Sequence, residues 1–309
     1  MRLACLRVLT QKKITTRSDL VASYVKDQIN HMKYNNVPKK VSAIRLATYN
    51  VHFWYDPTGS HVSYNNILKT IRELDIDILI LEEVTMGVIP IDKLYEDLGS
   101  LGYNSNNIIF GDASRYMGGA FGNLIASKYP IVQSKVESLV KYQVGRSAVI
   151  VDIIVNNKIL RVYGFHLDVF DVTETTRLNQ INSILHSANM SPFPVILAGD
   201  YNSVRRLDYS EVEWNLIVER DKERNVQTKC LVTNSIENNG WISSFVMMNL
   251  PSPKYTNWSG TTIDFIYLNK DHWTTNGNSS DKFQIIGTYV YHSYDSDHIP
   301  VLMDFRVSN

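Results

Sequence analysis

Short runs of consecutive apolar residues alternate with segments of helical periodicity from Val41 almost to the C-terminus. The apolar runs are of strand length and have no polar face, which indicates strands buried on both sides. The clearest of them are residues 44–49, 76–81, 160–165 and 195–198. Residues 64–74 and 173–188 instead carry apolar side chains three and four positions apart, and are predicted helices. The alternation of buried strands and helices predicts an α/β fold.

The middle and the end of the chain are richer in strands. A β-meander is predicted from four runs, with a turn at Asn156-Asn157 before the last: residues 122–127, 132–140, 147–155 and 159–164. Further strands are predicted at residues 262–268, 283–290 and 300–305. Mixed strand pairs together with flanking helices predict two stacked mixed β-sheets with helices outside, a single α/β sandwich of four layers.

The first 40 residues differ from the rest in charge. The chain is formally neutral, but residues 1–40 hold nine Lys and Arg against two Asp, a net charge of +7 that the remainder balances with −7. Residues 18–32 carry apolar side chains at helical spacing, with Ser18 as a plausible N-cap, and Pro38 with two lysines forms a predicted hinge. We therefore predict a basic N-terminal extension with one helix (residues 1–40) and a body of residues 41–309. The extension either holds a polyanion through phosphate contacts or is a solvated tail, the slightly favoured interpretation.

The composition excludes several classes of protein. With 44% hydrophobic residues and 20% charged residues in 309, the chain can bury a substantial core and is not of a disordered, collagen-like or coiled-coil type. Cys5 and Cys230 form no disulfide framework, which fits an intracellular, reducing compartment. No apolar run is long enough to predict a membrane span. The Arg-bearing, acid-poor N-terminus has the composition of an organelle transit peptide, a weak signal.

Polar side chains stand at the ends of six apolar runs. A buried strand gains nothing from such an end unless the polar group has a partner. The segments are Asn50-Val51-His52, Glu82-Glu83, His166-Leu167-Asp168, Asp200-Tyr201-Asn202, Ile263-Asp264 and Asp297-His298. Each alone has a structural explanation, such as a turn or a helix cap. Their joint appearance at predicted strand ends indicates a site.

In this order, the six segments resemble the endonuclease/exonuclease/phosphatase superfamily, also called DNase I-like, over residues 41–305. The resemblance implies in-line hydrolysis of a phosphate ester by an activated water, without a covalent enzyme intermediate. It implies a metal site of Glu83, Asn50 and Asp297, whose hard oxygen ligands suit Mg²⁺, with Mn²⁺ as an alternative. Glu82 stands where the family usually has Gln. It either alters the affinity or choice of metal, or is a solvent-facing neighbour of the ligand.

The resemblance also implies the catalytic groups. Asp200 matches the aspartate that activates the water, and Asn202 matches the residue that holds it or a phosphate oxygen. His298 would contact a non-bridging phosphate oxygen, with Asp264 fixing its tautomer and keeping it charged. His166 resembles a second phosphate-facing histidine, and Asp168 is a candidate supporting residue behind it. Arg177 and Gln180 match a helix pattern of the family that we interpret as structural.

Substrate contacts are predicted for Asn123, Arg146 and Trp258. Asn123 and Arg146 resemble residues near the substrate phosphate, although Arg146 can equally end a strand. Trp258, with Tyr255, lies in a loop that can stack on a nucleobase or a tyrosyl ring, or can belong to the core.

The residues favour a nucleic-acid phosphodiesterase, either a nuclease or a DNA-end-processing enzyme with DNA or RNA as partner. The alternatives are a phosphomonoesterase and a phosphodiesterase for lipids or inositol phosphates. A non-catalytic binding module would predict loss of Glu83, Asp200 or His298, and all three are present. The step Asn50-Val51 argues against the abasic-site endonucleases.

Overall fold

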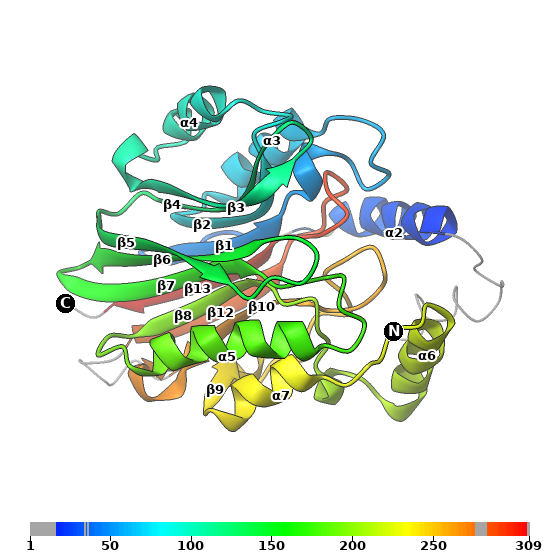
Figure 1. The fold of residues 1–309 in the computed structure, drawn as a ribbon. Helices are drawn as coiled ribbons and strands as arrows, with labels where there is room; N and C mark the ends of the chain where they lie inside the picture. Colours follow the sequence, from blue (N-terminus) through cyan, green and yellow to red (C-terminus); the bar gives the residue numbers. More distant parts are fainter. Residues whose placement is uncertain (1–16, 34, 36, 276–282, 308–309) are drawn as a thin grey trace.

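Two mixed β-sheets stack face to face in the computed structural model, which describes residues 17–33, 35, 37–275 and 283–307 (Figure 1). Within this part of the chain, one sheet has seven strands in the order β11-β12-β13-β1-β2-β4-β3 and the other has six in the order β5-β6-β7-β8-β10-β9. Cys5 and four of the nine basic residues of the N-terminal extension lie outside the described residues. The predicted pair of stacked mixed sheets is confirmed.

The strands of the first sheet are β1 (Ile44–Asn50), β2 (Ile78–Thr85), β3 (Ile108–Tyr116), β4 (Gly119–Ser127), β11 (Trp273–Thr274), β12 (Phe283–Val290) and β13 (Val301–Val307). Those of the second are β5 (Ile131–Leu139), β6 (Arg146–Val155), β7 (Lys158–His166), β8 (Val195–Asp200), β9 (Trp241–Ser243) and β10 (Asp264–Asn269). The α-helices are α2 (Arg17–Met32), α3 (Tyr64–Leu74), α4 (Ile91–Ser100), α5 (Thr175–Asn189), α6 (Glu211–Glu223), α7 (Leu231–Asn238) and α8 (Ser244–Met247). Short 3₁₀ turns are η1 (His52–Trp54), η2 (Ser105–Asn107), η3 (Arg206–Asp208) and η4 (Lys270–His272).

Alternate residues of the strands divide between an inner and an outer core. Ile78 and Ile80 of β2 pack between the sheets, whereas Leu79 and Leu81 face outward. Helices α3 and α4 cover the outer face of the first sheet, and α5 and α7 cover that of the second (Figure 1). Strands with both faces buried read as continuous apolar runs, which explains why the sequence predicts them so clearly.

The predicted meander is wrong in its first member. Strand β4 pairs with β2 and β3 in the seven-stranded sheet, whereas β5, β6 and β7 run as a meander in the other. Apolar patterning marks strands but does not specify their partners, so the step from one sheet to the other between Ser127 and Ile131 leaves no signal in the pattern.

The strand ends also differ from prediction at two places. Glu82 and Glu83 lie inside β2 rather than after it, at an irregularity where the register with β4 shifts and Glu83 adopts a φ of 59°. Asp264 begins β10 instead of ending a strand. A bulge turns a side chain away from the regular alternation, and here it re-aims Glu83.

The N-terminal helix packs on the body. In α2, Leu20, Val21, Tyr24 and Gln28 are buried, and the Tyr24 hydroxyl donates to the Ser296 carbonyl at 3.2 Å. Ser18 lies within the helix, so its prediction as the N-cap is wrong. After the helix, Lys39 in the predicted hinge forms an ion pair with Asp77 at 2.7 Å. The extension therefore joins the body through specific contacts in its described part.

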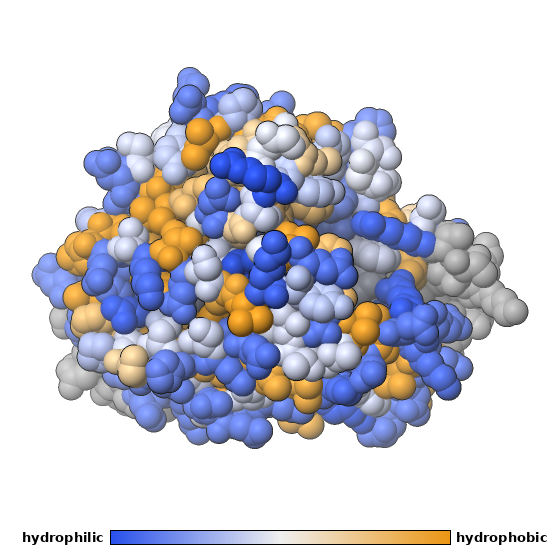
Figure 2. Space-filling model, in the orientation of Figure 1, coloured by the Kyte–Doolittle hydropathy of each residue, from blue (hydrophilic) through white to orange (hydrophobic). Residues whose placement is uncertain are grey.

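The outer edge of the six-stranded sheet is amphipathic. Strand β5 exposes Val132 and Val136 beside charged neighbours, and hydrophobic and hydrophilic side chains are interspersed over this face in Figure 2. Charged side chains on an edge strand discourage pairing with another chain. Within the described residues, none of the helices combines the length and apolar character that crossing a membrane requires.

Candidate active site

The predicted catalytic residues meet because three neighbouring strands place them in register. In the parallel pair β7–β8, His166 stands opposite Asp200, and in the antiparallel pair β8–β10, Asp200 stands opposite Asp264. Strand β1 ends at Asn50 in the facing sheet, and its side-chain amide donates to Asp200 Oδ2 at 3.0 Å. The strand ends of both sheets thus meet at the Asp200 carboxylate.

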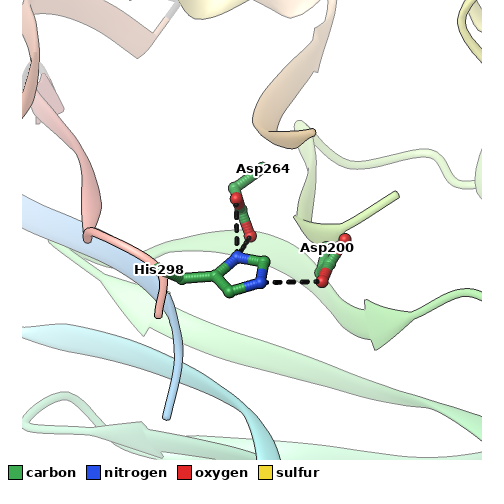
Figure 3. A group of neighbouring side chains, drawn as sticks. All are labelled: Asp200, Asp264 and His298. Carbon is green, nitrogen blue, oxygen red and sulfur yellow. Dashed lines mark hydrogen bonds and ion pairs between the residues drawn. The ribbon is translucent and has the colours of Figure 1, made fainter. Parts of the chain in front are cut away.

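Asp264, His298 and Asp200 form a chain of polar contacts (Figure 3). His298, in the loop before β13, places Nδ1 at 3.1 and 3.0 Å from the two Asp264 carboxylate oxygens. Its Nε2 lies 3.8 Å from Asp200 Oδ2. Burial acts to lower the pKa of His298, but the charges of Asp264, Asp200 and Asp297 and the Asp264 hydrogen bond hold it well above the usual value. His298 is therefore an imidazolium at neutral pH.

Asp200 is almost fully buried and its pKa is raised. Its Oδ1 accepts a hydrogen bond from the Asn202 backbone N–H at 2.8 Å. Burial raises the pKa of Asp200 to about 7, with the Asp264 charge adding to the rise and the His298 charge opposing it. A carboxylate with this pKa gains and loses a proton near neutral pH, which is the property required of a general base.

His166 has the opposite charge state from His298. Arg146 Nη1 lies 3.1 Å from His166 Nδ1, and burial, followed by the charges of Arg146 and His298, keeps the pKa of His166 well below its usual value. Because a guanidinium can only donate, Nδ1 is the acceptor of this contact. Nε2 lies 2.8 Å from Asn202 Nδ2, which is itself a donor, and 3.5 Å from Asp200 Oδ2.

Glu82 and Glu83 are adjacent but differently placed. Glu82 is fully buried and its Oε1 accepts from Thr48 Oγ1 at 2.5 Å, so the solvent-facing interpretation of Glu82 is wrong. Burial raises the pKa of Glu82 well above the usual value and also raises that of Glu83. Glu83 Oε1 lies 3.8 Å from His166 Nδ1.

The carboxylate oxygens of the site fit a divalent cation. The Oε2 atoms of Glu82 and Glu83 are buried without a hydrogen-bond partner in the described structure, and a buried carboxylate oxygen is costly unless it binds a cation or a donor. Ligand atoms of Asp200, Asp264 and His298 also lie within 4.8 Å of one another, but the imidazolium form of His298 has no lone pair with which to bind an ion. Carboxylate oxygens are the ligands that Mg²⁺ and Mn²⁺ prefer.

The other two predicted metal ligands have neighbours of their own. Asn50 Oδ1 accepts from the His52 backbone N–H at 3.0 Å. Asp297 Oδ2 lies 3.6 Å from His52 Nε2 and 3.7 Å from Arg17 Nη2, and its Oδ1 lies 3.9 Å from His298 Nε2. Both residues are therefore beside the catalytic group.

A cavity of about 580 Å³ opens over these residues. Its lining includes these predicted site residues: Glu83, His166, Asp200, Asn202, Trp258, Asp297 and His298. This volume lies in the range of sites for drug-sized ligands and exceeds what a phosphate group alone would fill. Asn50 and Asp264, two predicted site residues outside the lining, contact Asp200 and His298 respectively.

Two predicted substrate contacts make protein contacts instead. The Asn123 side chain, on β4, donates to the Ser147 carbonyl at 2.8 Å, and the Arg146 side chain is buried against His166. Neither is part of the cavity lining. Arg146 thus contacts His166 instead of facing the cavity.

Asp168, Arg177 and Gln180 form the support of the loop after β7. Asp168 Oδ1 accepts from the backbone N–H groups of Phe170 and Asp171 at 2.8 and 2.7 Å. Arg177 donates to the Asp168 carbonyl and Gln180 accepts from its N–H. These bonds agree with the structural interpretation of Arg177 and Gln180.

Sequence reasoning gave no role to His52 or Arg17, although both line the cavity. His52 follows the Asn50 segment and has a left-handed φ of 45°, a backbone feature that no residue pattern indicates. Arg17 comes from the extension, far from the body in sequence. It stands directly before the predicted helix of residues 18–32, so the sequence pattern did not include it in any element.

Comparisons with known proteins agree with this fold. The model of the Endonuclease/Exonuclease/phosphatase family matches residues 47–298. An endonuclease/exonuclease/phosphatase from Beutenbergia cavernae is 18% identical with a TM-score of 0.64, over 87% of this chain and 72% of that chain. The human Nocturnin catalytic domain with bound sulfate is 18% identical with a TM-score of 0.63, over 87% and 96%. D. rerio TDP2, complexed with a single strand DNA product, is 16% identical with a TM-score of 0.57, over 86% and 100%. No curated protein matches the sequence.

Two stacked mixed sheets with flanking helices are the fold of the DNase I-like sandwich class, and the family match makes the chain a phosphoric ester hydrolase. The sequence match extends over most of the sandwich, from β1 to the loop before β13. The chain belongs to the Endonuclease/Exonuclease/phosphatase family.

Proposed function

We propose that this chain is a Mg²⁺-dependent phosphodiesterase, with Mn²⁺ as an alternative ion, that hydrolyses DNA or RNA through an activated water. The observation that carries the proposal is the contact chain Asp264–His298–Asp200, which faces a cavity beside a neutral His166. These residues supply a base, a charged donor and a neutral imidazole around one point. This combination suits in-line displacement at phosphorus.

In this proposal Asp200 accepts the proton of the attacking water. Its carboxylate is oriented by Asn50 and by the Asn202 N–H, and its pKa of about 7 suits proton uptake at neutral pH. Proton transfer by such a group contributes about 10²–10⁴-fold to the rate.

His298 and His166 stabilise the phosphate. Asp264 accepts from His298 Nδ1, so Nε2–H is left to donate toward a non-bridging oxygen, and the neutral His166 lies beside the same Asp200 carboxylate. Donors fixed in advance where negative charge develops lower the barrier. Glu83, Asn50 and Asp297 would hold the divalent cation, which supplies further positive charge against the phosphate and the leaving oxygen.

A nucleic acid as substrate is supported by the shape of the site and by one comparison. The cavity is larger than a phosphate needs and its lining carries four arginines, Arg17, Arg177, Arg220 and Arg224. The TDP2 structure of similar fold holds a single strand DNA product. Arginines around a phosphoesterase site favour a substrate with several phosphates.

A substrate panel tests the proposal. The chain is incubated with Mg²⁺ and single-stranded DNA, RNA, 5′-tyrosyl-DNA or inositol phosphates, and the products are resolved by chromatography. We expect cleavage of at least one nucleic-acid substrate that stops with a chelator. Turnover of the inositol phosphates alone would assign the chain to the rival phosphatases, and binding without any turnover would make it a non-catalytic module.

A further inference from the structure

One wall of the cavity joins the N-terminal helix to α6. Arg17 begins α2, whereas Arg220 lies in the last turn of α6 and Arg224 is its C-cap, and the two helices lie on the same side of the molecule (Figure 1). The guanidinium carbons of Arg17 and Arg224 lie 4.9 and 5.5 Å from the centre of the Trp258 ring. Such cation–π contacts orient a guanidinium without neutralising it.

The three arginines differ in how far their charges are balanced. Arg220 is bound to Asp221 Oδ1 at 2.8 Å and to the Ser259 carbonyl at 2.7 Å, and Arg17 lies 3.7 Å from Asp297. In the described chain, the Arg224 guanidinium has neither a hydrogen bond nor an ion pair. Burial, the charges of Arg220 and Arg17 and the partly opposing charges of Asp221 and Glu223 act on it, and its pKa is lowered. An anion placed between Arg17 and Arg224 would relieve this repulsion.

Apolar side chains line other parts of the same cavity. Val169, Phe170 and Val172, in the loop between β7 and α5, are 43–50% exposed, and Tyr116 and Met117, at the turn between β3 and β4, are each 45% exposed. Large apolar groups left in contact with water inside a cavity mark a ligand surface. The cavity therefore suits a ligand that has both phosphates and flat apolar rings.

We propose that Arg17 and Arg224, held by Trp258, form a subsite for the phosphate next to the scissile one in a nucleic-acid strand. The apolar residues of the cavity would contact the bases. This inference rests on the proposed function and specifies its substrate as an oligonucleotide of at least two phosphates. Trp258 positions the two guanidinium groups in this arrangement rather than stacking on a base. The helix α2, which precedes the region matched to the family, then becomes part of the substrate site.

Binding of a short oligonucleotide tests the subsite directly. Fluorescence anisotropy of a labelled single-stranded DNA tetranucleotide, with chelator present to prevent cleavage, gives Kd over a series of salt concentrations. Arg224→Gln and Arg17→Gln each remove one charge at similar length. We expect each to weaken binding about tenfold, the loss typical of one charge-assisted hydrogen bond, and to reduce the salt slope by about 0.7.

Lys222→Gln is the matched control. Lys222 is an exposed residue of α6 outside the cavity lining, so removing its charge should leave Kd and the salt slope unchanged. Melting temperatures verify that all variants are folded. If Lys222→Gln weakens binding as much as Arg224→Gln, the effect is general electrostatics and the subsite is refuted. Tight binding of inositol hexakisphosphate that depends on Arg224, without oligonucleotide binding, also refutes it.

Kinetics separate the subsite from the proposed function. The ratio of kcat/KM for the tetranucleotide to that for bis(4-nitrophenyl) phosphate, a diester with one phosphate, should fall about tenfold in Arg224→Gln and stay constant in Lys222→Gln. A constant ratio in both contradicts the subsite. If wild type hydrolyses neither substrate yet binds the oligonucleotide through Arg224, the proposed hydrolysis fails while the subsite survives.

Discussion

Two buried histidines at the site have opposite charge states because their neighbours differ. His298 contacts carboxylates, which hold its pKa well above the usual value despite burial. His166 contacts the Arg146 guanidinium, and burial together with this positive charge keeps its pKa well below it. One histidine is therefore a charged donor and the other is neutral. Environment, rather than residue type, assigns the two roles.

Asp200 makes stability depend on pH. In the folded chain its pKa is about 7, above the ordinary 3.8, so the folded state binds more protons between these values. The contribution of Asp200 therefore destabilises the fold progressively as pH rises from about 4 to about 7. We measure the free energy of unfolding by denaturant titration, with metal removed by a chelator. We expect it to fall less with rising pH in Asp200→Asn than in the wild type. Identical pH dependence in wild type and variant would contradict the raised pKa.

Glu82 offers a second test at the residue scale. Burial raises its pKa well above the usual value and so favours the protonated form, which resembles the Gln that the family usually has there. We expect Glu82→Gln to keep kcat within about twofold and to leave the Mg²⁺ requirement unchanged, as measured by a metal titration of the initial rate. A tenfold change in the Mg²⁺ needed would indicate that Glu82 is ionised when metal is bound.

Single elements carry the site because each contributes one or two side chains at its end. The sequence predicts β1, β7 and β8 well, since buried parallel strands are continuously apolar and their carboxyl ends meet at one edge. For this reason Asn50, His166 and Asp200 could be predicted from the sequence. In contrast, β3 is largely half-exposed and α6 buries only Ile217, so neither leaves a strong apolar pattern. The bulge that aims Glu83 depends on pairing with β4, which local sequence does not encode.

Helix α2 supports the catalytic loop, and this support can be measured. The Tyr24 hydroxyl donates to the carbonyl of Ser296, the second residue before His298. We expect Tyr24→Phe to lower the free energy of unfolding by about 1 kcal/mol, the usual net value of a buried hydrogen bond. Denaturant titration gives this value. Ile29→Gln is the control, because Ile29 lies on the same helix but is 54% exposed. Equal losses in the two variants would show that the Tyr24 contact adds nothing specific.

At the scale of the molecule, the two stacked sheets bring side chains from distant parts of the sequence to one cavity. The order of the six polar segments along the chain predicted the fold and the residues at the centre of the site. This was possible because that order reflects the topology of the whole chain. Arg17 and His52 escaped prediction. Their positions depend on how α2 packs and on a left-handed turn after β1, which are tertiary and backbone features.

The rate of oligonucleotide hydrolysis is the most direct test of metal-dependent catalysis by Asp200 and His298. Initial rates are measured for wild type, Asp200→Asn and His298→Ala, with chelator and then with excess Mg²⁺. We expect chelator to stop hydrolysis by the wild type and Mg²⁺ to restore it. Both variants should lose at least about 100-fold in rate. Their melting temperatures with Mg²⁺ should stay close to that of the wild type. Rates unaffected by chelator, or variants as fast as wild type, would contradict the account.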